Sequence, residues 1–274
     1  MVGGASSRMK NSLEKAAISP SQKDAAKTLH KSLIPLGEEQ RPLLYYLLKN
    51  AAAANINRVY LITSKENDAF KDVLKGFMKV PPFHSLEINF AVQHLKKGSY
   101  KPLGTADALQ QCMEQYPQLM KEHFIVCNGD NLYSSGAFLA LQRNLGVANG
   151  LIAYEGAYLG HSEEKLAKFA LLDFNKEGVL TDIIEKPNTT LWEAYKKRHK
   201  ALWISMNIFC FYGEAIYPFL VNCELNPQRN EKELPMAVRK MMKSNRHPIR
   251  CIQRAEKIPD LTAAQDILTF DPKA

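Results

Sequence analysis

The segment from Phe124 to Tyr133 places a carboxylate directly after an apolar run. Phe124 to Cys127 is typical of a short buried strand, and Asn128 to Asn131 follows it at once with the order Asn-Gly-Asp-Asn. In an open α/β sheet, ligands bind at the carboxyl ends of the strands, so Asp130 could hold a hard cation such as Mg²⁺ against a phosphate. Because Asn-Gly-Asp is also ordinary turn chemistry, a plain turn is the alternative interpretation.

The beginning of the chain is rich in groups that bind phosphate. Residues 3–8 comprise two glycines, an alanine, two serines and Arg8. Glycines let backbone N–H groups approach a phosphate closely, and the hydroxyls and Arg8 supply further donors. The pattern is neither G-x-G-x-x-G nor a Walker A loop. A flexible terminus rich in glycine and serine is the alternative interpretation.

Six short motifs occur along the chain in an order that resembles one enzyme family. They are Gly3-Gly4-x-Ser6-Ser7-Arg8, Lys31-x-x-x-Pro35-x-Gly37, Gly104-Thr105-Ala106, Asn128-Gly129-Asp130-Asn131, Glu185-Lys186-Pro187 and Ser205-Met206-Asn207-Ile208-Phe209. Each motif alone is weak, but the ordered series is similar to that of the sugar-1-phosphate nucleotidyltransferases, also called nucleoside-diphosphate-sugar pyrophosphorylases. The resemblance covers nearly the whole chain, from Gly3 to about Asp266.

The resemblance implies an α/β fold of the nucleotidyltransferase type, with a Rossmann-like, doubly wound, mixed and mostly parallel sheet. The alternation of strand-like and helical runs favours the same class. We expect one nucleotidyltransferase domain over residues 1–274, and no β-helix domain at the C-terminus because no hexapeptide repeat is present. Only Met1 and Val2 precede the glycines, whereas strands average about five to six residues, so the first strand is expected to be truncated.

Hydrophobic periodicity predicts the positions of most elements. Strands are expected at residues 58–63, 86–92, 124–127, 150–154, 169–174, 179–185, 202–211 and 249–253. Helices are expected at residues 43–54, 68–78, 105–116, 136–145, 191–200, 214–223, 234–243 and 263–268. Residues 10–30 form a polar, partly helical insert between Arg8 and Lys31, and this insert is a candidate for a mobile flap.

The family resemblance implies a reaction in which an oxygen of a sugar-1-phosphate attacks the α-phosphorus of a nucleoside triphosphate and pyrophosphate leaves. Such a transfer depends on alignment and on positive charge around crowded anions. Carried over by motif, the catalytic residues would be Arg8, Lys31 and Asp130. The nucleotide-binding residues would be Gly3, Gly4, Ala5, Ser6, Ser7, Gln93, Gly104 and Thr105.

The resemblance also implies a metal and an acceptor site. Mg²⁺ would be held by Asp130 and by Asp260, because residues 258–266 resemble the family's Asp-x-Gly-Thr-x-x-Asp segment with Thr262 in place of the glycine. The phosphorylated sugar would be bound by Glu185, Lys186, Ser205 and Asn207. Asn207 replaces the glycine of a Ser-Met-Gly element, and its amide would narrow or re-aim the sugar pocket.

Composition limits the partners. The net charge of +8 and the pI near 9.1 suit anionic substrates, but no aromatic-interleaved basic stripe indicates nucleic acid. No apolar run approaches the roughly 18–20 residues of a membrane helix, and no signal-peptide pattern is present, so a cytoplasmic location is expected. The five cysteines include no C-x-x-C pair and fit reduced core thiols. The oligomeric state is not indicated.

Two alternatives to the sugar-1-phosphate reaction stay open. The Gly-Gly-x-Ser-Ser-Arg-Met start also resembles cytidylyl- and molybdopterin-type nucleotidyltransferases, which would change the phosphorylated acceptor and keep Mg²⁺ and pyrophosphate release. A non-catalytic nucleotide-sugar-binding regulator is the other alternative. The presence of Arg8, Lys31 and Asp130 together argues against it, since binding alone has less need of all three.

Overall fold

The structure is a computed structural model, and it describes residues 1–4, 6–96, 98–146, 149–227, 229–244 and 246–272. The chain folds into two compact units. Unit 1 comprises Met1–Lys101, Asn128–Phe138 and Ile258–Ala274, and unit 2 comprises Pro102–Cys127 and Leu139–Lys257. The expectation of a single domain over the whole chain stays a prediction.

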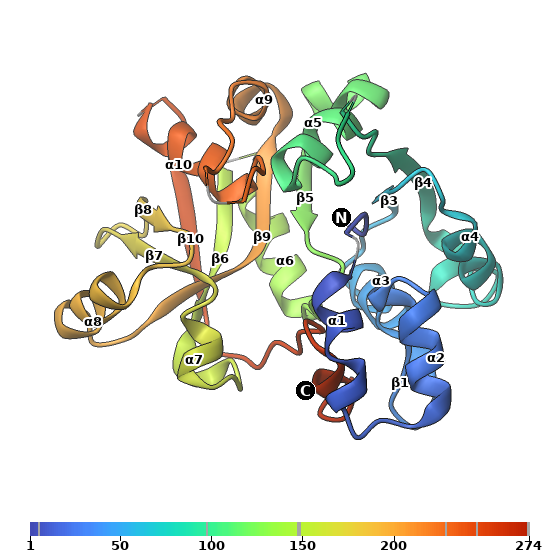
Figure 1. Cartoon of the computed structure of the whole chain (residues 1–274). Coiled ribbons are helices and arrows are strands. Elements are labelled where there is room, and N and C mark those ends of the chain that lie inside the picture. Colours follow the sequence, from blue (N-terminus) through green and yellow to red (C-terminus); the bar gives the residue numbers. More distant parts are fainter. Residues whose placement is uncertain (5, 97, 147–148, 228, 245, 273–274) are drawn as a thin grey trace. The chain divides into compact units, whose positions relative to one another are not determined.

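Unit 1 consists of short helices and two small sheets (Figure 1). Its helices are α1 (Ser7–Asn11), α2 (Pro20–Thr28), α3 (Leu43–Ala53) and α4 (Asp68–Lys75), with short 3-10 helices at Leu13–Lys15, η2 (Lys31–Leu33), Phe83–Ser85 and η6 (Ala264–Ile267). Its strands are β1 (Pro35–Leu36), β2 (Arg41–Pro42), β3 (Arg58–Thr63) and β4 (Glu87–Val92).

Unit 2 holds the large sheet and most of the longer helices. Its strands are β5 (His123–Cys127), β6 (Asn149–Glu155), β7 (Ala170–Phe174), β8 (Leu180–Ile184), β9 (Trp203–Tyr212) and β10 (Ile249–Arg254). Its helices are α5 (Thr105–Gln115), α7 (Glu163–Leu166), α8 (Thr189–Arg198), α9 (Gly213–Val221) and α10 (Leu234–Lys243), with 3-10 helices at Pro117–Lys121 and Gly156–Tyr158. Helix α6 (Ser135–Asn144) begins in unit 1 and ends in unit 2.

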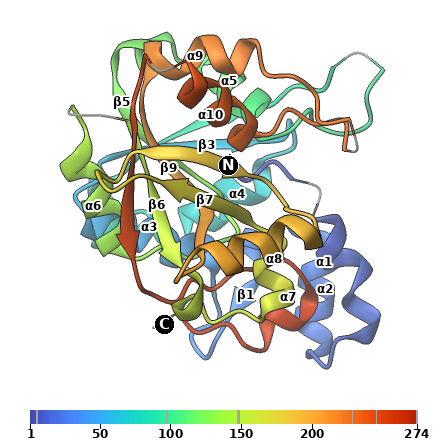
Figure 2. The same cartoon turned by 90° about the vertical axis from the view of Figure 1, so that its left-hand side faces the viewer.

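The six-stranded sheet of unit 2 is mixed. Its order is β10-β6-β9-β7-β8, with β5 also paired to β9. β10 and β6 are parallel, and β9 is antiparallel to β5, β6 and β7. Four of the six strands (β10, β6, β5 and β7) therefore run in one direction, and β9 and β8 run in the other. Helices α5, α9 and α10 pack together, and both views show them gathered beside this sheet (Figures 1 and 2).

A second parallel arrangement organises unit 1. β3 and β4 pair in parallel from Arg58 opposite Glu87 to Thr63 opposite Val92. The segment before the glycines adds to this pair, because the Val2 N–H donates to the Ile62 carbonyl at 2.8 Å. On its other flank the Met1 carbonyl accepts from the Gly129 N–H at 2.9 Å. Met1 and Val2 thus link β3 to the segment that follows β5.

The observed elements confirm the sequence-based fold class and most boundaries. The strand predicted at 58–63 and the helix predicted at 234–243 match β3 and α10. The strands predicted at 169–174 and 179–185 match β7 and β8, which pair antiparallel. The two-residue strands β1 and β2 were not predicted, because so short a segment shows no periodicity. The insert at 10–30 contains α2, and its buried residues Leu13, Ala16, Ile18 and Ala26 show that it packs against the fold.

Among the residues that the structure describes, no helix combines the length and the apolar character needed to span a membrane. The cytoplasmic location stays a prediction.

Candidate active site

The apolar core of unit 1 fixes two of the segments that carry candidate site residues. Val2 and Leu33 are 3% and 2% exposed and belong to one hydrophobic cluster. Val2 directly precedes Gly3, and Leu33 ends η2, which begins at Lys31. Burying such side chains stabilises a fold by about 1.5–3 kcal/mol each. The start of the Gly-rich segment and the Lys31 segment are therefore anchored in the same core.

Gly3 lies at the carboxyl ends of β3 and β4. A Cβ atom on Gly3 would be 3.4 Å from the backbone carbon of Thr63 and 3.6 Å from Gln93 Oε1. The Gln93 N–H donates to the Thr63 carbonyl at 2.8 Å, and Gln93 is 6% exposed. Gly3 and Gln93, both predicted to bind nucleotide, are thus brought together at the edge where parallel α/β sheets bind ligands.

Three further residues of the Gly-rich segment are open to solvent. Gly4, Ser7 and Arg8 are exposed, and a Cβ atom on Gly4 would meet nothing within 4 Å. Ser6 has a φ of 53°, in the left-handed region, and α1 begins at the next residue. Ala5, also predicted to bind nucleotide, lies outside the described residues. The Arg8 guanidinium therefore stands on the first turn of α1, where a ligand can reach it.

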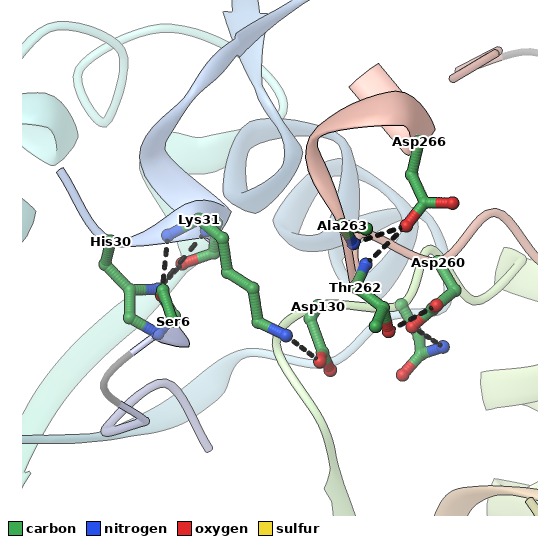
Figure 3. Close-up of polar contacts among 10 residues, drawn as sticks. Ser6, His30, Lys31, Asp130, Asp260, Thr262, Ala263 and Asp266 are labelled. Atoms are coloured by element: carbon green, nitrogen blue, oxygen red, sulfur yellow. Dashed lines mark hydrogen bonds and ion pairs between the residues drawn. The ribbon is translucent and has the colours of Figure 1, made fainter. Parts of the chain in front are cut away.

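Lys31, Ser6 and Asp130 converge from three segments of unit 1 (Figure 3). The Lys31 ammonium forms an ion pair with Asp130 Oδ2, and the two side chains are 13% and 19% exposed. The Lys31 N–H donates to Ser6 Oγ at 3.3 Å. Burial by itself would raise the pKa of Asp130, but the charge and hydrogen bond of Lys31 outweigh it, so that pKa lies below its ordinary value. Asp130 is therefore held as a carboxylate beside a cation.

His30 shapes the segment that carries Lys31. The His30 side chain caps η2, because its Nδ1 accepts the Ser32 N–H at 3.2 Å. The same Nδ1 lies 2.7 Å from Ser32 Oγ. Burial, with the neighbouring charge of Lys31, lowers the pKa of His30 to about 4. The imidazole is therefore neutral at pH 7, which keeps Nδ1 an acceptor and adds no positive charge next to Lys31.

Asp260 comes from a segment that runs beside the Asp130 segment. An isolated antiparallel bridge pairs Asn131 with Asp260, and the Leu261 N–H donates to the Asp130 carbonyl at 2.8 Å. Asp260 Oδ2 accepts from the Thr262 hydroxyl at 2.7 Å, and Oδ1 accepts from the Asn131 amide at 3.3 Å. The structure therefore brings Asp130 and Asp260, predicted as a metal pair, onto adjacent backbone segments (Figure 3).

The turn that follows Asp260 is hydrogen-bonded to the end of α1, the helix that carries Arg8. Asp266 Oδ2 accepts from the Thr262 N–H at 2.8 Å. Ser12 Oγ accepts the Ala264 N–H at 2.8 Å and donates to carbonyls at the end of α1, with the Arg8 carbonyl at 2.9 Å. A single hydroxyl thus joins the Arg8 helix to the Asp260 turn within unit 1.

The donor set of Asp130 and Asp260 fits Mg²⁺. Both side chains offer carboxylate oxygens, the hard donors that Mg²⁺ prefers. Among the described residues, no group of three or more His, Cys, Asp and Glu side chains is arranged to hold a metal ion. Mg²⁺ usually takes one or two carboxylates and completes its octahedral shell with water and substrate phosphates, so two aspartates suffice.

Unit 2 carries a second polar group at the end of β8. Lys186 Nζ lies 3.7 Å from Glu185 Oε1 and 3.9 Å from Glu233 Oε1. Burial, followed by the charge of Glu233, raises the pKa of Glu185 to about 7, against the opposing charges of Lys186 and Arg229. Lys186 has a φ of 44°, a left-handed conformation that turns the chain sharply before Pro187. The Glu185–Lys186 pair predicted for the acceptor is therefore brought together with Glu233.

Gly104 and Thr105 pack against the segment that leads into α10. Gly104 has a φ of 112°, and a Cβ atom there would be 2.5 Å from the Lys232 carbonyl oxygen. The Thr105 hydroxyl accepts the Leu234 N–H at 2.9 Å, one of the N–H groups that the first turn of α10 leaves without an intrahelical partner. Both positions hold α5 to α10, and any contact with a nucleotide would be additional to that role.

Ser205 and Asn207 lie at an irregularity in β9. The register with β6 shifts between Leu151, opposite Phe209, and Ala153, opposite Ser205. Asn207 has a φ of 58°, which asparagine tolerates better than most residues, and its N–H donates to Ser205 Oγ at 3.2 Å. The backbone at Asn207 is therefore one that favours glycine, and Ser205 is only 1% exposed.

Comparison with known proteins shows the family. Residues 24–270 match the nucleotidyl transferase family. The chain belongs to that family. A glucose-1-phosphate adenylyltransferase from Hydrogenovibrio crunogenus is 24% identical over 208 residues, which make up 75% of this chain and 47% of that protein. The chain thus spans about half the length of the curated relative that it matches.

Solved structures support the fold of this nucleotidyltransferase. UDP-glucose pyrophosphorylase complexed with UDP-glucose is similar with a TM-score of 0.69 and 16% identity, over 98% of this chain and 94% of that chain. The apo form of UDP-glucose pyrophosphorylase gives a TM-score of 0.67 at 16% identity, over 98% and 93% of the two chains. The expected nucleotidyltransferase fold is therefore confirmed.

Sequence reasoning missed three residues that shape the candidate site of this nucleotidyltransferase. His30 orders η2, and Glu233 and Arg229 join Lys186 in unit 2. Glu233 stands before Leu234-Pro235, and a proline in the first turn is a helix-start signal that could have located it. That signal places Glu233 at the beginning of α10, but the contact with Lys186 depends on how the chain folds back.

Proposed function

We propose that this nucleotidyltransferase moves a nucleotidyl group from a nucleoside triphosphate to a sugar-1-phosphate, forming a nucleoside-diphosphate sugar and pyrophosphate. The observation that carries the proposal is the meeting of Lys31 with Asp130 next to the Gly-rich segment. A cation, a carboxylate and the exposed residues Gly4 and Arg8 lie in one unit, and they suit the positioning and charge stabilisation that phosphoryl transfer requires.

The triphosphate is assigned to unit 1. Arg8 and the backbone N–H of Gly4 would bind its oxygens, because both residues are exposed. Lys31 would contact a phosphate as a point charge. To do so, its ammonium would leave Asp130 and pair with the phosphate instead. Gln93, held against Gly3, would read the edge of the base.

Asp130 and Asp260 would hold Mg²⁺ through carboxylate oxygens. When bound, the ion supplies Lewis-acid polarisation of the phosphate oxygens and offsets their charge. The protein contributes the geometry, since Asn131 and Thr262 fix the Asp260 carboxylate. Lys31 would hold the Asp130 carboxylate until the ligand takes its place.

The sugar-1-phosphate is assigned to unit 2. Lys186 would pair with its phosphate, while Glu185 and the β9 residues Ser205 and Asn207 would face its hydroxyls. Glucose-1-phosphate is the first acceptor to test, because the relative from Hydrogenovibrio crunogenus is a glucose-1-phosphate adenylyltransferase and the similar structures are UDP-glucose pyrophosphorylases. In the reaction the acceptor phosphate oxygen forms a bond to the α-phosphorus, and the bond from that phosphorus to the α,β-bridging oxygen breaks, so that this oxygen leaves with pyrophosphate.

The proposal is tested by pyrophosphate release from a panel of nucleoside triphosphates and sugar-1-phosphates with and without Mg²⁺. We expect release only when a triphosphate, a sugar-1-phosphate and the metal are present together. Release that needs a different phosphorylated acceptor would favour the cytidylyl- or molybdopterin-type alternative. Binding of a nucleotide sugar without turnover in any combination would favour the non-catalytic regulator.

A further inference from the structure

Glu233 is a buried carboxylate in a place where burial is costly. It is 5% exposed and directly precedes α10. A buried carboxyl group stays ionised only beside a cation or when it accepts several hydrogen bonds, and otherwise it becomes protonated. Its partners therefore indicate why the chain retains it.

Two cationic side chains meet the same oxygen of Glu233. Arg229 Nη1 forms an ion pair with Glu233 Oε1, and Lys186 Nζ lies 3.9 Å from that atom. The Asn226 amide donates to the other oxygen, Oε2, at 2.8 Å. Glu185 also lies beside Lys186, at 3.7 Å, and Glu231 lies beside Arg229, at 3.1 Å. Glu233 is the carboxylate that the two cations share, and it offsets their mutual repulsion.

The backbone around Glu233 is fixed on both sides. The N–H groups of Met236 and Ala237 donate to its carbonyl at 3.0 and 3.4 Å, as in the first turn of a helix. On the other side, Thr105 accepts the N–H of Leu234. The backbone that carries the carboxylate is therefore fixed at the start of a helix. The Lys186 ammonium, in contrast, is at the end of a long side chain on a turn, and 39% of that side chain is exposed.

We infer that Glu233 is a positioning residue, which holds the Lys186 ammonium where the acceptor phosphate binds. The inference rests on the proposed function, because Lys186 has an acceptor to bind only in that reaction. A lysine loses side-chain rotamer entropy when it is fixed in one position. Restraining Lys186 in the unliganded protein means that less of this entropy is lost when the phosphate arrives.

The test compares steady-state constants of wild type, Glu233→Gln, Lys186→Ala and the double variant, with glucose-1-phosphate as acceptor. Glu224→Gln is the matched control. Glu224 also pairs with a lysine, Lys240 of α10, but its side chain is 73% exposed. We expect Glu233→Gln to raise the acceptor KM about tenfold and to leave the triphosphate KM within about twofold, as loss of one charged contact does. In the Lys186→Ala background the same change should have almost no further effect.

Several results would overturn the inference. They are equal increases in both KM values, a rise in the acceptor KM that persists without Lys186, or acceptor constants that match those of Glu224→Gln. If Glu233→Gln does not fold, Glu233→Asp keeps the charge but withdraws it from Lys186, and a wild-type acceptor KM for that variant would also refute the inference. Absence of pyrophosphate release by wild type with every sugar-1-phosphate would instead refute the proposed function.

Discussion

The Lys31 ammonium contacts Asp130 Oδ2, although 99 positions separate the two residues in the chain. Sequence motifs suggested two separate tasks, phosphate binding for Lys31 and metal binding for Asp130. In the structure each side chain is the other's counter-charge, and both are largely buried. A ligand that engages one of them therefore changes the electrostatic environment of the other.

This ion pair predicts a coupled response to mutation. Asp130→Asn and Lys31→Met should each abolish most turnover, and each should lower the free energy of unfolding by about 1–3 kcal/mol, because the remaining charge is partly buried without its partner. The double variant should be less destabilised than the sum of the two, as measured by urea unfolding. Strictly additive losses would mean that the pair does not form in solution.

Glu185 predicts a pH-dependent contribution to stability. Its pKa is about 7 in the folded protein and 4.5 ordinarily, so protonation favours the folded state. The stability from this group is complete below about pH 4.5 and is lost as pH rises through about 7. The difference in free energy of unfolding between Glu185→Gln and wild type should therefore shift in favour of the variant by up to roughly 3 kcal/mol from acid to alkaline pH. Urea unfolding of both proteins across that pH range measures this shift. A difference in free energy of unfolding that stays constant with pH would show that the pKa of Glu185 is not raised in the folded protein.

Lys186 predicts selectivity between the two substrates. Lys186→Ala should raise the KM for the sugar-1-phosphate by about tenfold or more and change the triphosphate KM by less than about twofold, because a charged contact to only one substrate is lost. Lys240→Ala is the control, since Lys240 pairs with the exposed Glu224. Equal effects of Lys186→Ala on both substrates would remove Lys186 from the acceptor site.

Gly104 predicts a large loss of stability on substitution. Gly104→Ala would combine a φ of 112° with a Cβ atom 2.5 Å from the Lys232 carbonyl oxygen. Gly146→Ala separates the two effects, because Gly146 has a φ of 81° and nothing within 4 Å of its Cβ position. We expect about 1 kcal/mol of destabilisation at Gly146 and at least about 3 kcal/mol at Gly104. Similar unfolding midpoints for the two variants would contradict the close approach of Lys232.

Sequence patterns predicted the elements well where periodicity and end signals are strong. β3, at Arg58–Thr63, reads as a continuous strand pattern, and α10 begins with Leu234 and Pro235, so both boundaries were located. The role of Gly129 could not be predicted in this way. A Cβ atom there would collide with the Val2 side chain, so packing against a distant segment, in addition to turn geometry, requires the glycine.

The contacts that shape the candidate site were harder to predict than the residues that carry its chemistry. Motif order located Lys31, Asp130 and Lys186, because their residue types define their chemistry. It did not locate Glu233, whose partner Lys186 lies on another element. It also did not show that the Thr105 hydroxyl is engaged by Leu234, since that bond depends on how α5 and α10 pack.

The most direct test of the proposed reaction follows a radiolabel on the α-phosphorus of the triphosphate that gives the fastest pyrophosphate release with glucose-1-phosphate and Mg²⁺. We predict that the label appears in a nucleoside-diphosphate sugar, that unlabelled pyrophosphate forms in equal amount, and that Asp130→Asn forms neither. Label found only in nucleoside mono- or diphosphate, or product formed at an undiminished rate by Asp130→Asn, would contradict nucleotidyl transfer at the site of Lys31 and Asp130.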